Sequence, residues 1–383
     1  MSKRQKRILL ALGWYDYRLH DGIAKYALEH GWHLCPDTTK EKVIPWGWQG
    51  DGILAWLGAG DDLAEFVNHA HKPTVDFSFR RPQLAFPRVL VDHVSAANLA
   101  AEHFLLRGLT NFIFYSDVEN WAYEEGGRAF IQAIERAGHS CTWLCWQRSP
   151  SYTKEQEQWK IKRKWLAAEL KKAPKPLAVF AASDDQAVEI LEICDSAGLA
   201  VPEQVSIIGM DNSLRAVDAM RTPISSVDTN LSLLGYRGAK LLDDLMHGKP
   251  PPAEPVRVPV AGLITRKSSD LIAVNDPGVA KGLKFLLENY HKLIGVDDMA
   301  RAASMSRRGF HKAFLEQIGR PPGHELQRVR IEHAKKLLVQ SDQKLAVVGE
   351  LCGYQNPNTF WFAFKQAIGM SPKEFRAKNR WRI

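Results

Sequence analysis

Short apolar runs alternate with longer amphipathic stretches over the first 270 residues. Apolar runs bounded by turn residues favour buried strands, and apolar residues spaced three and four apart favour helices. The runs predicted as strands are 7–12, 52–57, 74–77, 89–92, 111–116, 177–182 and 205–209. The stretches predicted as helices are 19–30, 96–107, 128–137, 156–171, 186–197 and 233–247. Strand–helix alternation of this kind predicts an α/β region with parallel sheets covered by helices on both faces.

The pattern changes after a segment at 271–277, which is predicted to be a linker. Asp276 is a good helix cap, and Pro277 suits the first helical position. From there to the end the periodicity is helical, which predicts an all-α region over 278–383. The expected helices are 277–290, 296–303, 306–318, 322–340, 345–352, 357–368 and 372–379.

This helical region contains an internal repeat with an offset of 49 residues before a turn and 50 after it. Each copy has a short helix, a turn, a polar cap and an i,i+4 phenylalanine pair that shares one buried face. The pairs are Phe310 with Phe314 and Phe360 with Phe364. A helix, a tight turn and a capped second helix are the plan of a helix-turn-helix unit.

Charge is unevenly distributed along the chain. Residues 275–383 hold 19 of the 51 Lys and Arg residues but 10 of the 43 Asp and Glu residues, a net charge of +9. The preceding 274 residues carry a net charge of −1. A basic excess confined to the helical region suits a surface that binds DNA phosphates. The alternative is an ordinary basic surface in contact with solvent.

Other classes of protein find little support in the sequence. No apolar run reaches the ~18 residues of a membrane span, and the run after the basic start is too short for a signal peptide, so it is predicted as a first core strand. The five cysteines lack a Cys-x-x-Cys pair, which favours a reducing, cytoplasmic compartment. The 13 histidines lack metal-ligand spacing, and the common hydrolase and P-loop motifs are missing, so neither an enzyme, a metal site nor a cofactor is expected.

Side chains off the phenylalanine face of each second helix are the candidates for contacts with bases in the major groove. Arginine suits guanine, asparagine suits adenine, and aromatic rings can contact a thymine methyl group. The candidates are Arg307, Arg308, His311 and Lys312 in the first copy and Gln355, Asn356, Asn358, Trp361 and Phe362 in the second. The alternative, ordinary helical hairpins with solvated faces, accounts for one copy more readily than for two in a basic region.

Residues 277–380 resemble the DNA-binding region of the AraC/XylS family of transcription regulators. The resemblance rests mainly on the second copy, with Cys352-Gly353-Tyr354, Phe360, Phe364-Lys365, Gly369 and Ser371-Pro372. It implies two helix-turn-helix units joined by a long helix at about 322–340, reading adjacent major-groove segments. The chain departs from the family at Gly349, where alanine is usual and where glycine weakens a helix.

Residues 6–270 resemble the effector domain of the LacI/GalR family, which is similar to periplasmic sugar-binding proteins. The resemblance is strongest over 198–212 and also includes Ser183-Asp184 and Arg266-Lys267-Ser268-Ser269. It implies a type I fold of two α/β lobes over 1–270, joined by three crossovers near Tyr115, Val227 and Val258, with a ligand bound between the lobes. It also implies a homodimer.

A sugar needs carboxylates and amides for its hydroxyls and an aromatic ring for its apolar face. Carboxyl ends of parallel strands are where ligands bind in open α/β sheets. Asp16 and the rings of Tyr15 and Trp56 are candidates on this basis, with Trp14 and Tyr17 as further rings. The resemblance implies four more, of which Asp184 and Asp211 follow strands and match family positions, and Ser183 and Arg128 stand at or near positions that bind ligand in the family. For each acidic residue the alternative is a helix cap or an ion pair within a lobe.

Together the two resemblances imply a sugar-responsive regulator, expected to activate a pentose operon, with D-xylose as the first candidate effector and RNA polymerase as a partner. No membrane partner is expected. Two alternatives stay open. One is a transported sugar-binding protein, which has no use for 277–380. The other is a DNA repair methyltransferase with an AraC-like domain, which needs a nucleophilic cysteine such as Cys141 or Cys145.

Overall fold

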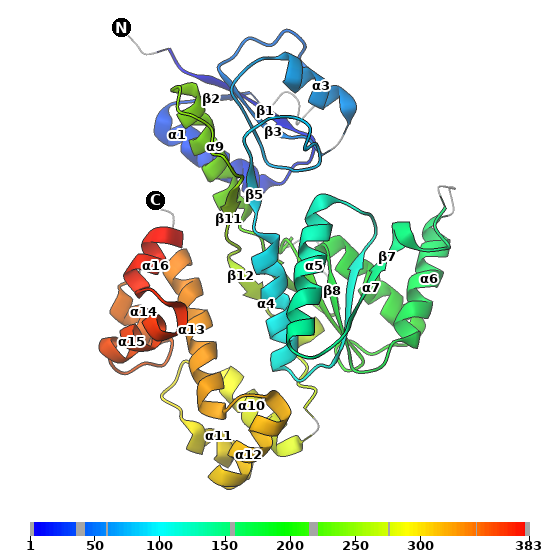
Figure 1. The fold of residues 1–383 in the computed structure, drawn as a ribbon, viewed down its shortest axis with the longest axis vertical. Helices are drawn as coiled ribbons and strands as arrows, with labels where there is room; N and C mark the ends of the chain where they lie inside the picture. The colour runs from blue at the N-terminus through cyan, green and yellow to red at the C-terminus, as the bar shows by residue number, and fades with distance from the viewer. Residues whose placement is uncertain are drawn as a thin grey trace. The chain divides into compact units, whose positions relative to one another are not determined.

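The computed structural model describes residues 4–35, 43–58, 60–153, 158–213, 221–274, 276–341 and 343–379. The chain forms two compact units (Figure 1). The first unit comprises residues 1–95, 119–125 and 229–260, and the second comprises 96–118, 126–228 and 261–383. The three crossovers near Tyr115, Val227 and Val258 stay a prediction.

The first unit is built on a parallel sheet with strand order β2-β1-β3-β4. The strands are β1 (Arg7–Leu12), β2 (His33–Cys35), β3 (Gly52–Trp56) and β4 (Thr74–Asp76), and β5 (Val89–Val91) pairs separately with β11 (Val256–Val258). The helices are α1 (Tyr17–His30), α3 (Asp61–His69) and α9 (Leu231–Met246). In the central strand β1 every residue after the exposed Arg7 is apolar and buried, as expected of a parallel strand covered on both faces.

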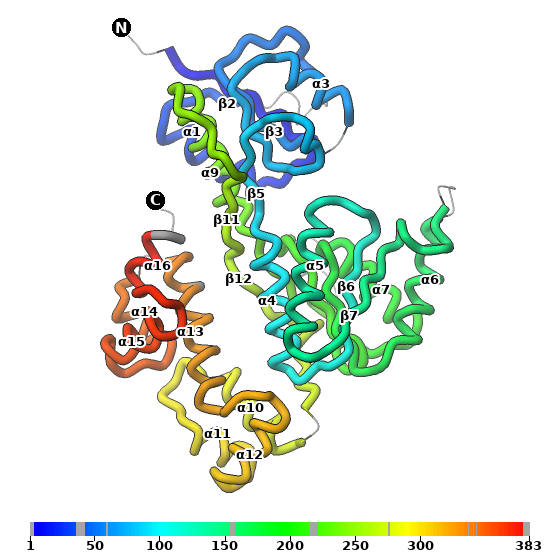
Figure 2. Tube along the Cα trace, viewed as in Figure 1, coloured from blue at the N-terminus to red at the C-terminus, as the bar shows by residue number. Residues whose placement is uncertain are grey.

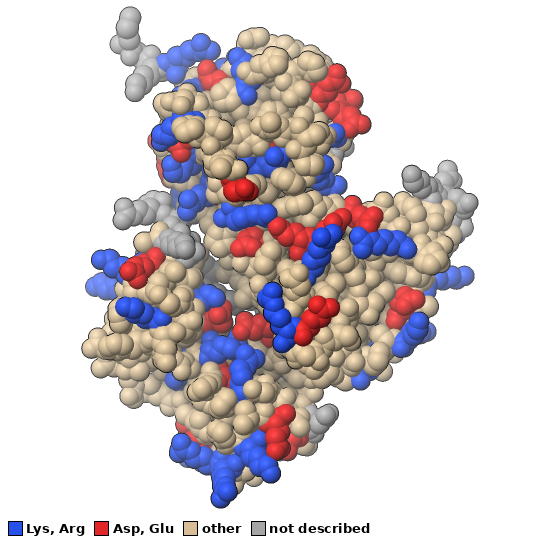
Figure 3. All heavy atoms as spheres, viewed as in Figure 1, with Lys and Arg blue, Asp and Glu red and all other residues tan. Residues whose placement is uncertain are grey.

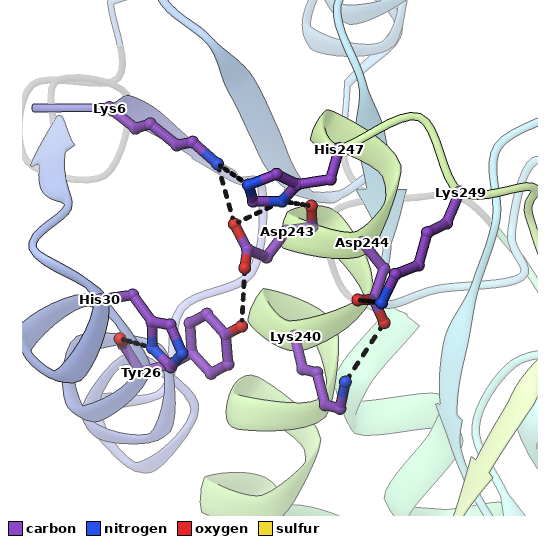
Figure 4. Close-up of polar contacts among 8 residues, drawn as sticks. All are labelled: Lys6, Tyr26, His30, Lys240, Asp243, Asp244, His247 and Lys249. Carbon is purple, nitrogen blue, oxygen red and sulfur yellow. Dashed lines mark hydrogen bonds and ion pairs between the residues drawn. The ribbon is translucent and has the colours of Figure 1, made fainter. Parts of the chain in front are cut away.

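Helices α1 and α9 approach each other closely because each carries a glycine at the crossing. A Cβ atom on Gly22 would lie 1.9 Å from the carbonyl oxygen of Ser232, and one on Gly235 would lie 2.1 Å from that of Leu19. Polar contacts extend this packing at the far end of α9 (Figure 4). Asp243 accepts hydrogen bonds from Nζ of Lys6 at 3.0 Å and from the hydroxyl of Tyr26 at 3.1 Å. The Asp243 carboxylate on α9 therefore connects the residue before β1 with α1.

The α/β part of the second unit contains a sheet with strand order β12-β10-β9-β8-β6-β7, parallel except for the β10–β12 pair. The strands are β6 (Asn111–Ser116), β7 (Cys141–Cys145), β8 (Leu177–Ala181), β9 (Val205–Met210), β10 (Ser225–Asp228) and β12 (Gly262–Ile264). The helices are α4 (His93–Leu106), α5 (Trp121–Arg136), α6 (Gln158–Lys172) and α7 (Asp184–Ala197), with 3-10 turns at Trp146–Arg148 and Lys267–Ser269. The first residues of α4 and α5 belong to the first unit.

The predicted strands are confirmed to within about a residue, but several elements were not predicted. The pattern did not predict elements that are short or that carry polar residues among the apolar ones. These elements are strands β2, β7, β10, β11 and β12 and helix α3. Helix α5 was expected from residue 128 but begins at Trp121. Gly126 and Gly127 weaken the helical pattern in its first turns, so the sequence did not predict them as helix. Packing requires glycine at one of these positions, because a Cβ on Gly127 would lie 2.6 Å from the Phe114 ring. Helix α6 was expected from 156, and residues 156 and 157 lie outside those described.

The remainder of the second unit is the helical region, and its seven predicted helices are confirmed to within one residue at each end. They are α10 (Pro277–Asn289), α11 (Val296–Ala302), α12 (Arg307–Ile318), α13 (Pro322–Gln340), α14 (Leu345–Leu351), α15 (Pro357–Ile368) and α16 (Pro372–Asn379). Helix α13 runs from the first helix-turn-helix unit to the second (Figure 2). Its Leu326 and Val329 belong to the core of the first, whereas Ile331, Ala334 and Leu338 belong to that of the second.

The predicted caps of the repeat are present in both copies. Ser306 caps α12 by accepting from the backbone N–H of Gly309, and Asn356 caps α15 by accepting from that of Asn358. Gly319 and Gly369 end these helices in the left-handed conformation, with φ of 74° and 78°. Asp276 caps α10, with Pro277 in its first turn. All four phenylalanines of the repeat are buried.

No helix among the described residues is long and apolar enough to cross a membrane.

Candidate functional site

Polar side chains gather where the parallel strands of the second unit reach their carboxyl ends. Asp117 follows β6, Ser183 and Asp184 follow β8, and Asp211 follows β9. Parallel register brings these ends to one edge of the sheet, as the pairing of β8 with both β6 and β9 requires. We refer to these residues, with Gln186, Asn212 and Asp228, as the polar edge.

Asp184 is buried within the polar edge, with 2% of its surface exposed. Its carboxylate accepts from the Ser226 hydroxyl at 2.6 Å and from the Ser213 backbone N–H at 2.7 Å. Burial raises the pKa of Asp184 to about 8, and the nearby charge of Asp211 acts in the same direction. Asp184 therefore supports the turn after β9 through hydrogen bonds within the second unit.

The turn after β9 holds Asp211 and Asn212 in positive-φ conformations, with φ of 103° and 50°. Such conformations are costly for residues with a Cβ and persist where surrounding contacts hold them. Asn212 donates to Asp228 at 3.1 Å and accepts from Arg266 at 2.9 Å, and the backbone N–H of Asp211 donates to Val227. Asp211 itself is half-buried, and its backbone is held by these contacts.

Sequence reasoning missed Asp117 and Gln186. The amide of Gln186 donates to Asp117 at 2.6 Å, and its buried Oε1 has no hydrogen-bond partner within the described part of the chain. An unsatisfied buried acceptor beside a carboxylate is suited to a hydroxyl donor. Ser183 accepts from the backbone N–H of Gln186 at 3.3 Å and so serves as the cap of α7. The signal for Asp117 was its position directly after the predicted strand at 111–116.

The first unit places its candidates after β1 and at the end of β3. Asp16 caps α1 and is paired with Arg18 at 2.9 Å, so its carboxylate is already engaged within the unit. The Tyr15 hydroxyl lies 3.0 Å from Nδ1 of His20. Trp56 packs against Trp14 with ring centroids 4.6 Å apart, and Trp14 is 38% exposed. The two indoles form an aromatic surface of the kind that sugars stack on.

Arg128 lies on α5 in the second unit and is exposed. The neighbouring positions, Gly127 and Ala129, are buried, so the helix directs Arg128 away from the core.

The first helix-turn-helix unit presents its basic candidates to solvent. Arg307, Arg308, His311 and Lys312 are all exposed on α12, opposite Phe310 and Phe314. Lys and Arg side chains gather where Figure 1 places α12 (Figure 3). Arg307 pairs with Asp297 at 3.1 Å, but both side chains are mostly exposed, so this pair competes weakly with a phosphate.

The second unit of the repeat presents a different surface on α15. Gln355, Asn356 and Asn358 are exposed, and Phe362 is 67% exposed. Trp361 is half-buried, and Nζ of Lys365 lies over its ring, 4.9 Å from the ring centroid. The Asn356 oxygen accepts from the backbone of Asn358 at 2.7 Å, so this residue is engaged in capping its own helix.

The thiols are poor candidates for a nucleophile. Burial raises the pKa of the Cys141 thiol to about 12, which leaves almost no thiolate at neutral pH. Cys145 is buried. Among the described residues, no group of three or more His, Cys, Asp and Glu side chains could hold a metal ion.

Comparison with known proteins assigns both parts of the chain. Residues 101–269 match the family of periplasmic binding protein-like domains, and residues 299–378 match a helix-turn-helix domain family. The chain is 27% identical to the xylose operon regulatory protein of Haemophilus influenzae, covering 94% of this chain and 95% of that protein. It is also 27% identical to the xylose operon regulatory protein of Escherichia coli K12, over 95% and 94%.

The chain is homologous to the xylose operon regulatory proteins. It is therefore a helix-turn-helix transcription regulator with a periplasmic-binding-protein-like domain, and its relatives are regulators rather than enzymes. The solved structure of a xylose-binding transcription activator has the same fold over the full length of both chains, at a TM-score of 0.61 and 24% identity. A cellobiose complex of a transcriptional regulator matches 70% of this chain, at a TM-score of 0.53 and 21% identity.

Proposed function

We propose that the chain activates a pentose operon in the cytoplasm when it binds a monosaccharide, with D-xylose as the first candidate. The observation that carries the proposal is homology along nearly the whole chain to regulators named for a xylose operon. The domains proposed for these tasks are residues 1–270 for sensing and 278–383 for DNA, joined by 271–277.

The polar edge supports sugar binding through its chemistry. Asp211 offers a carboxylate held by a fixed backbone, and Gln186 offers a buried acceptor with no hydrogen-bond partner in the described chain. Asp117 and Ser183 add oxygens beside them. In the first unit Trp56, with Tyr15 nearby, supplies an aromatic surface, whereas Asp16 acts through Arg18. Arg128 is proposed only as an outer contact because it is exposed.

A thermal-shift screen of D-xylose, L-arabinose, D-ribose and D-glucose tests the sugar assignment. A ligand at 100 times its Kd should add ~2.7 kcal/mol of stability. Asp211→Ala should weaken sugar binding by roughly tenfold or more through lost hydroxyl hydrogen bonds. Asp185→Ala, at an exposed position beside Asp184, is the matched control and should bind normally. A screen in which no sugar raises the unfolding temperature would contradict the proposal.

We propose further that α12 and α15 enter adjacent major-groove segments of one operator half-site, ~34 Å apart. The exposed residues of α12 would contact bases and phosphates, and Gln355, Asn358, Trp361 and Phe362 would do so from the second unit of the repeat. A homodimer would then read two half-sites, and the activated operator would recruit RNA polymerase. Operator affinity measured between low and high salt should fall steeply as phosphate contacts release counterions. A slope near zero would contradict this assignment.

A further inference from the structure

An ion cluster joins the α/β part of the second unit to the helical region. Arg328 on α13 donates to Glu102 on α4, and it also donates to Glu325 at 2.8 Å. The Glu325 side chain is fully buried, and those of Arg328 and Glu102 are 19% and 31% exposed. Burial raises the pKa of the Glu102 carboxyl, and Arg328 opposes this rise by favouring the charged form. The cluster is thus more enclosed than an ordinary surface pair, and the α/β part contributes Glu102 to it.

The segment between the two parts is held on both sides. The backbone N–H of Ala273 donates to the carbonyl oxygen of Arg107, just after α4, at 2.6 Å. Val274 lies against Gly108, whose Cβ position would be 3.0 Å from its Cγ2. Ile272 and Val274 also pack against the core of the first helix-turn-helix unit. Residues 272–274 therefore contact both parts.

A connection at 272–274 alone would leave the helical region able to pivot about it, because backbone dihedrals in one short segment can absorb a rotation. The contact between Glu102 and Arg328 lies outside that segment, because it joins a residue within α4 to a residue within α13. Two separated attachments remove the pivot. Arg328 also cannot easily change partner, because Glu325 holds its other guanidinium edge.

We propose that Glu102 is a positioning residue that locks the first helix-turn-helix unit onto the α/β part of the second unit, so that the two move as one body. The partner surface on the helical region is the face of α13 around Arg328, where Glu332 and Lys335 also act on Glu102 electrostatically. Because of this lock, a rearrangement of the sensing domain that moves α4 would also move α13 and, with it, α12. This regulatory consequence rests on the proposed function, whereas the lock itself does not.

Amide hydrogen exchange of the full chain, without sugar or DNA, tests the lock alone. Glu102→Gln removes the charge at a partly exposed position and keeps the shape of the side chain. It should speed exchange of residues 271–274 and of the first half of α13 by roughly five- to tenfold. Glu288→Gln, which breaks the exposed pair of Lys284 and Glu288 on α10, should leave both segments unchanged. Wild-type exchange in Glu102→Gln would overturn the proposal whatever the chain senses.

Coupling between sugar and operator tests the consequence. In the wild type, sugar should change operator affinity by a factor in the usual allosteric range of roughly 5–150. In Glu102→Gln this factor should fall to within about twofold of one, with sugar affinity in the absence of DNA unchanged. A full wild-type factor in this variant would show that α13 is not positioned through Glu102. A wild type without any sugar response would instead refute the proposed function, and the exchange result would decide the lock by itself.

Discussion

Ser226 donates its hydroxyl to Oδ1 of Asp184 across 2.6 Å, which joins β10 to the start of α7 beneath the turn after β9. Both side chains are buried, at 0% and 2% exposure. The contact makes Asp184 a support for the polar edge, and its environment makes that support sensitive to pH.

Stability should fall as the pH rises through the range in which Asp184 keeps its proton only in the folded chain. Its pKa is raised from 3.8 to about 8, so between these values the folded state binds more protons than the unfolded state. Linkage then makes the free energy of unfolding decrease by up to about 1.4 kcal/mol per pH unit from this group. Asp184→Asn should remove this contribution, because an amide can still bond to both Ser226 and the backbone N–H of Ser213.

Thermal unfolding of wild type and Asp184→Asn at pH 5 and pH 8 measures the effect. The variant should gain stability relative to wild type at pH 8, by on the order of a few kcal/mol. Asp185→Asn, at the exposed neighbouring position, should follow the wild type at both values. Equal pH dependence in all three proteins would show that Asp184 is ionised in the folded chain.

Gly353 and Gly369 should differ in their tolerance of alanine although both are left-handed. Their φ values are 80° and 78°, so each substitution carries a conformational cost of about 1–2 kcal/mol. A Cβ on Gly353 would also lie 2.4 Å from the carbonyl oxygen of Tyr290, whereas nothing lies within 4 Å of one on Gly369. That carbonyl is held by Arg330 at 2.9 Å and cannot move freely.

Chemical denaturation followed through the helical region compares the two variants. Gly353→Ala should lose at least about 2 kcal/mol more than Gly369→Ala, because overpacking adds to the shared backbone cost. Equal losses would mean that the loop at Tyr290 relaxes away from the turn.

Asp243 should matter more to the first unit than its neighbour Asp244. Asp243 receives Lys6 and Tyr26 from other elements, while Asp244 pairs with Lys240 and Lys249 near the end of its own helix. Asp243→Asn should lower the free energy of unfolding by about 1–2 kcal/mol, and Asp244→Asn by less than about 1 kcal/mol. Urea midpoints at low and high salt check this, since the Asp244 effect should largely vanish in salt. The reverse order would contradict the role given to Asp243.

The helical region was predictable because its determinants are local. Ser306, Gly319 and the phenylalanine spacing act within a few residues of one another, so periodicity and caps fix its helices. The polar edge was only partly predictable. Strand ends pointed to Asp184 and Asp211, but the partner of Asp184 stands 42 residues away, and the unsatisfied oxygen of Gln186 emerges only from packing.

Long-range charge pairing escaped the sequence altogether. Glu102 looks like any solvated helix residue until α13 lies beside it, 226 residues later in the chain. Asp16 illustrates the same limit for a local contact, because the pattern did not indicate that its carboxylate accepts from Arg18. Hydrophobic periodicity predicts neither the pairing of Glu102 with Arg328 nor that of Asp16 with Arg18, since surface charges have many possible neighbours before the fold is known.

Substitutions at Phe360 and Phe362 should distinguish the contribution of α15 to stability from its contribution to DNA recognition. Phe360 is 1% exposed and packs against Tyr354 and Phe364, with ring centroids 5.4 and 5.8 Å away. Phe362, two positions on, is 67% exposed. Phe360→Ala should therefore cost about 3–5 kcal/mol of stability by opening a cavity. Phe362→Ala should change stability by less than about 0.5 kcal/mol.

Operator affinity should respond in the opposite way. If the Phe362 ring contacts a thymine methyl group, its removal should weaken operator binding by roughly tenfold while nonspecific binding stays unchanged. Fluorescence anisotropy with operator and with scrambled DNA, at one salt concentration, measures both. Lys365→Ala provides a comparison, because removing a positive charge that lies near phosphates should weaken binding to both DNAs alike. A folded Phe362→Ala protein with wild-type operator affinity would remove α15 from base recognition at that position and leave specificity to α12.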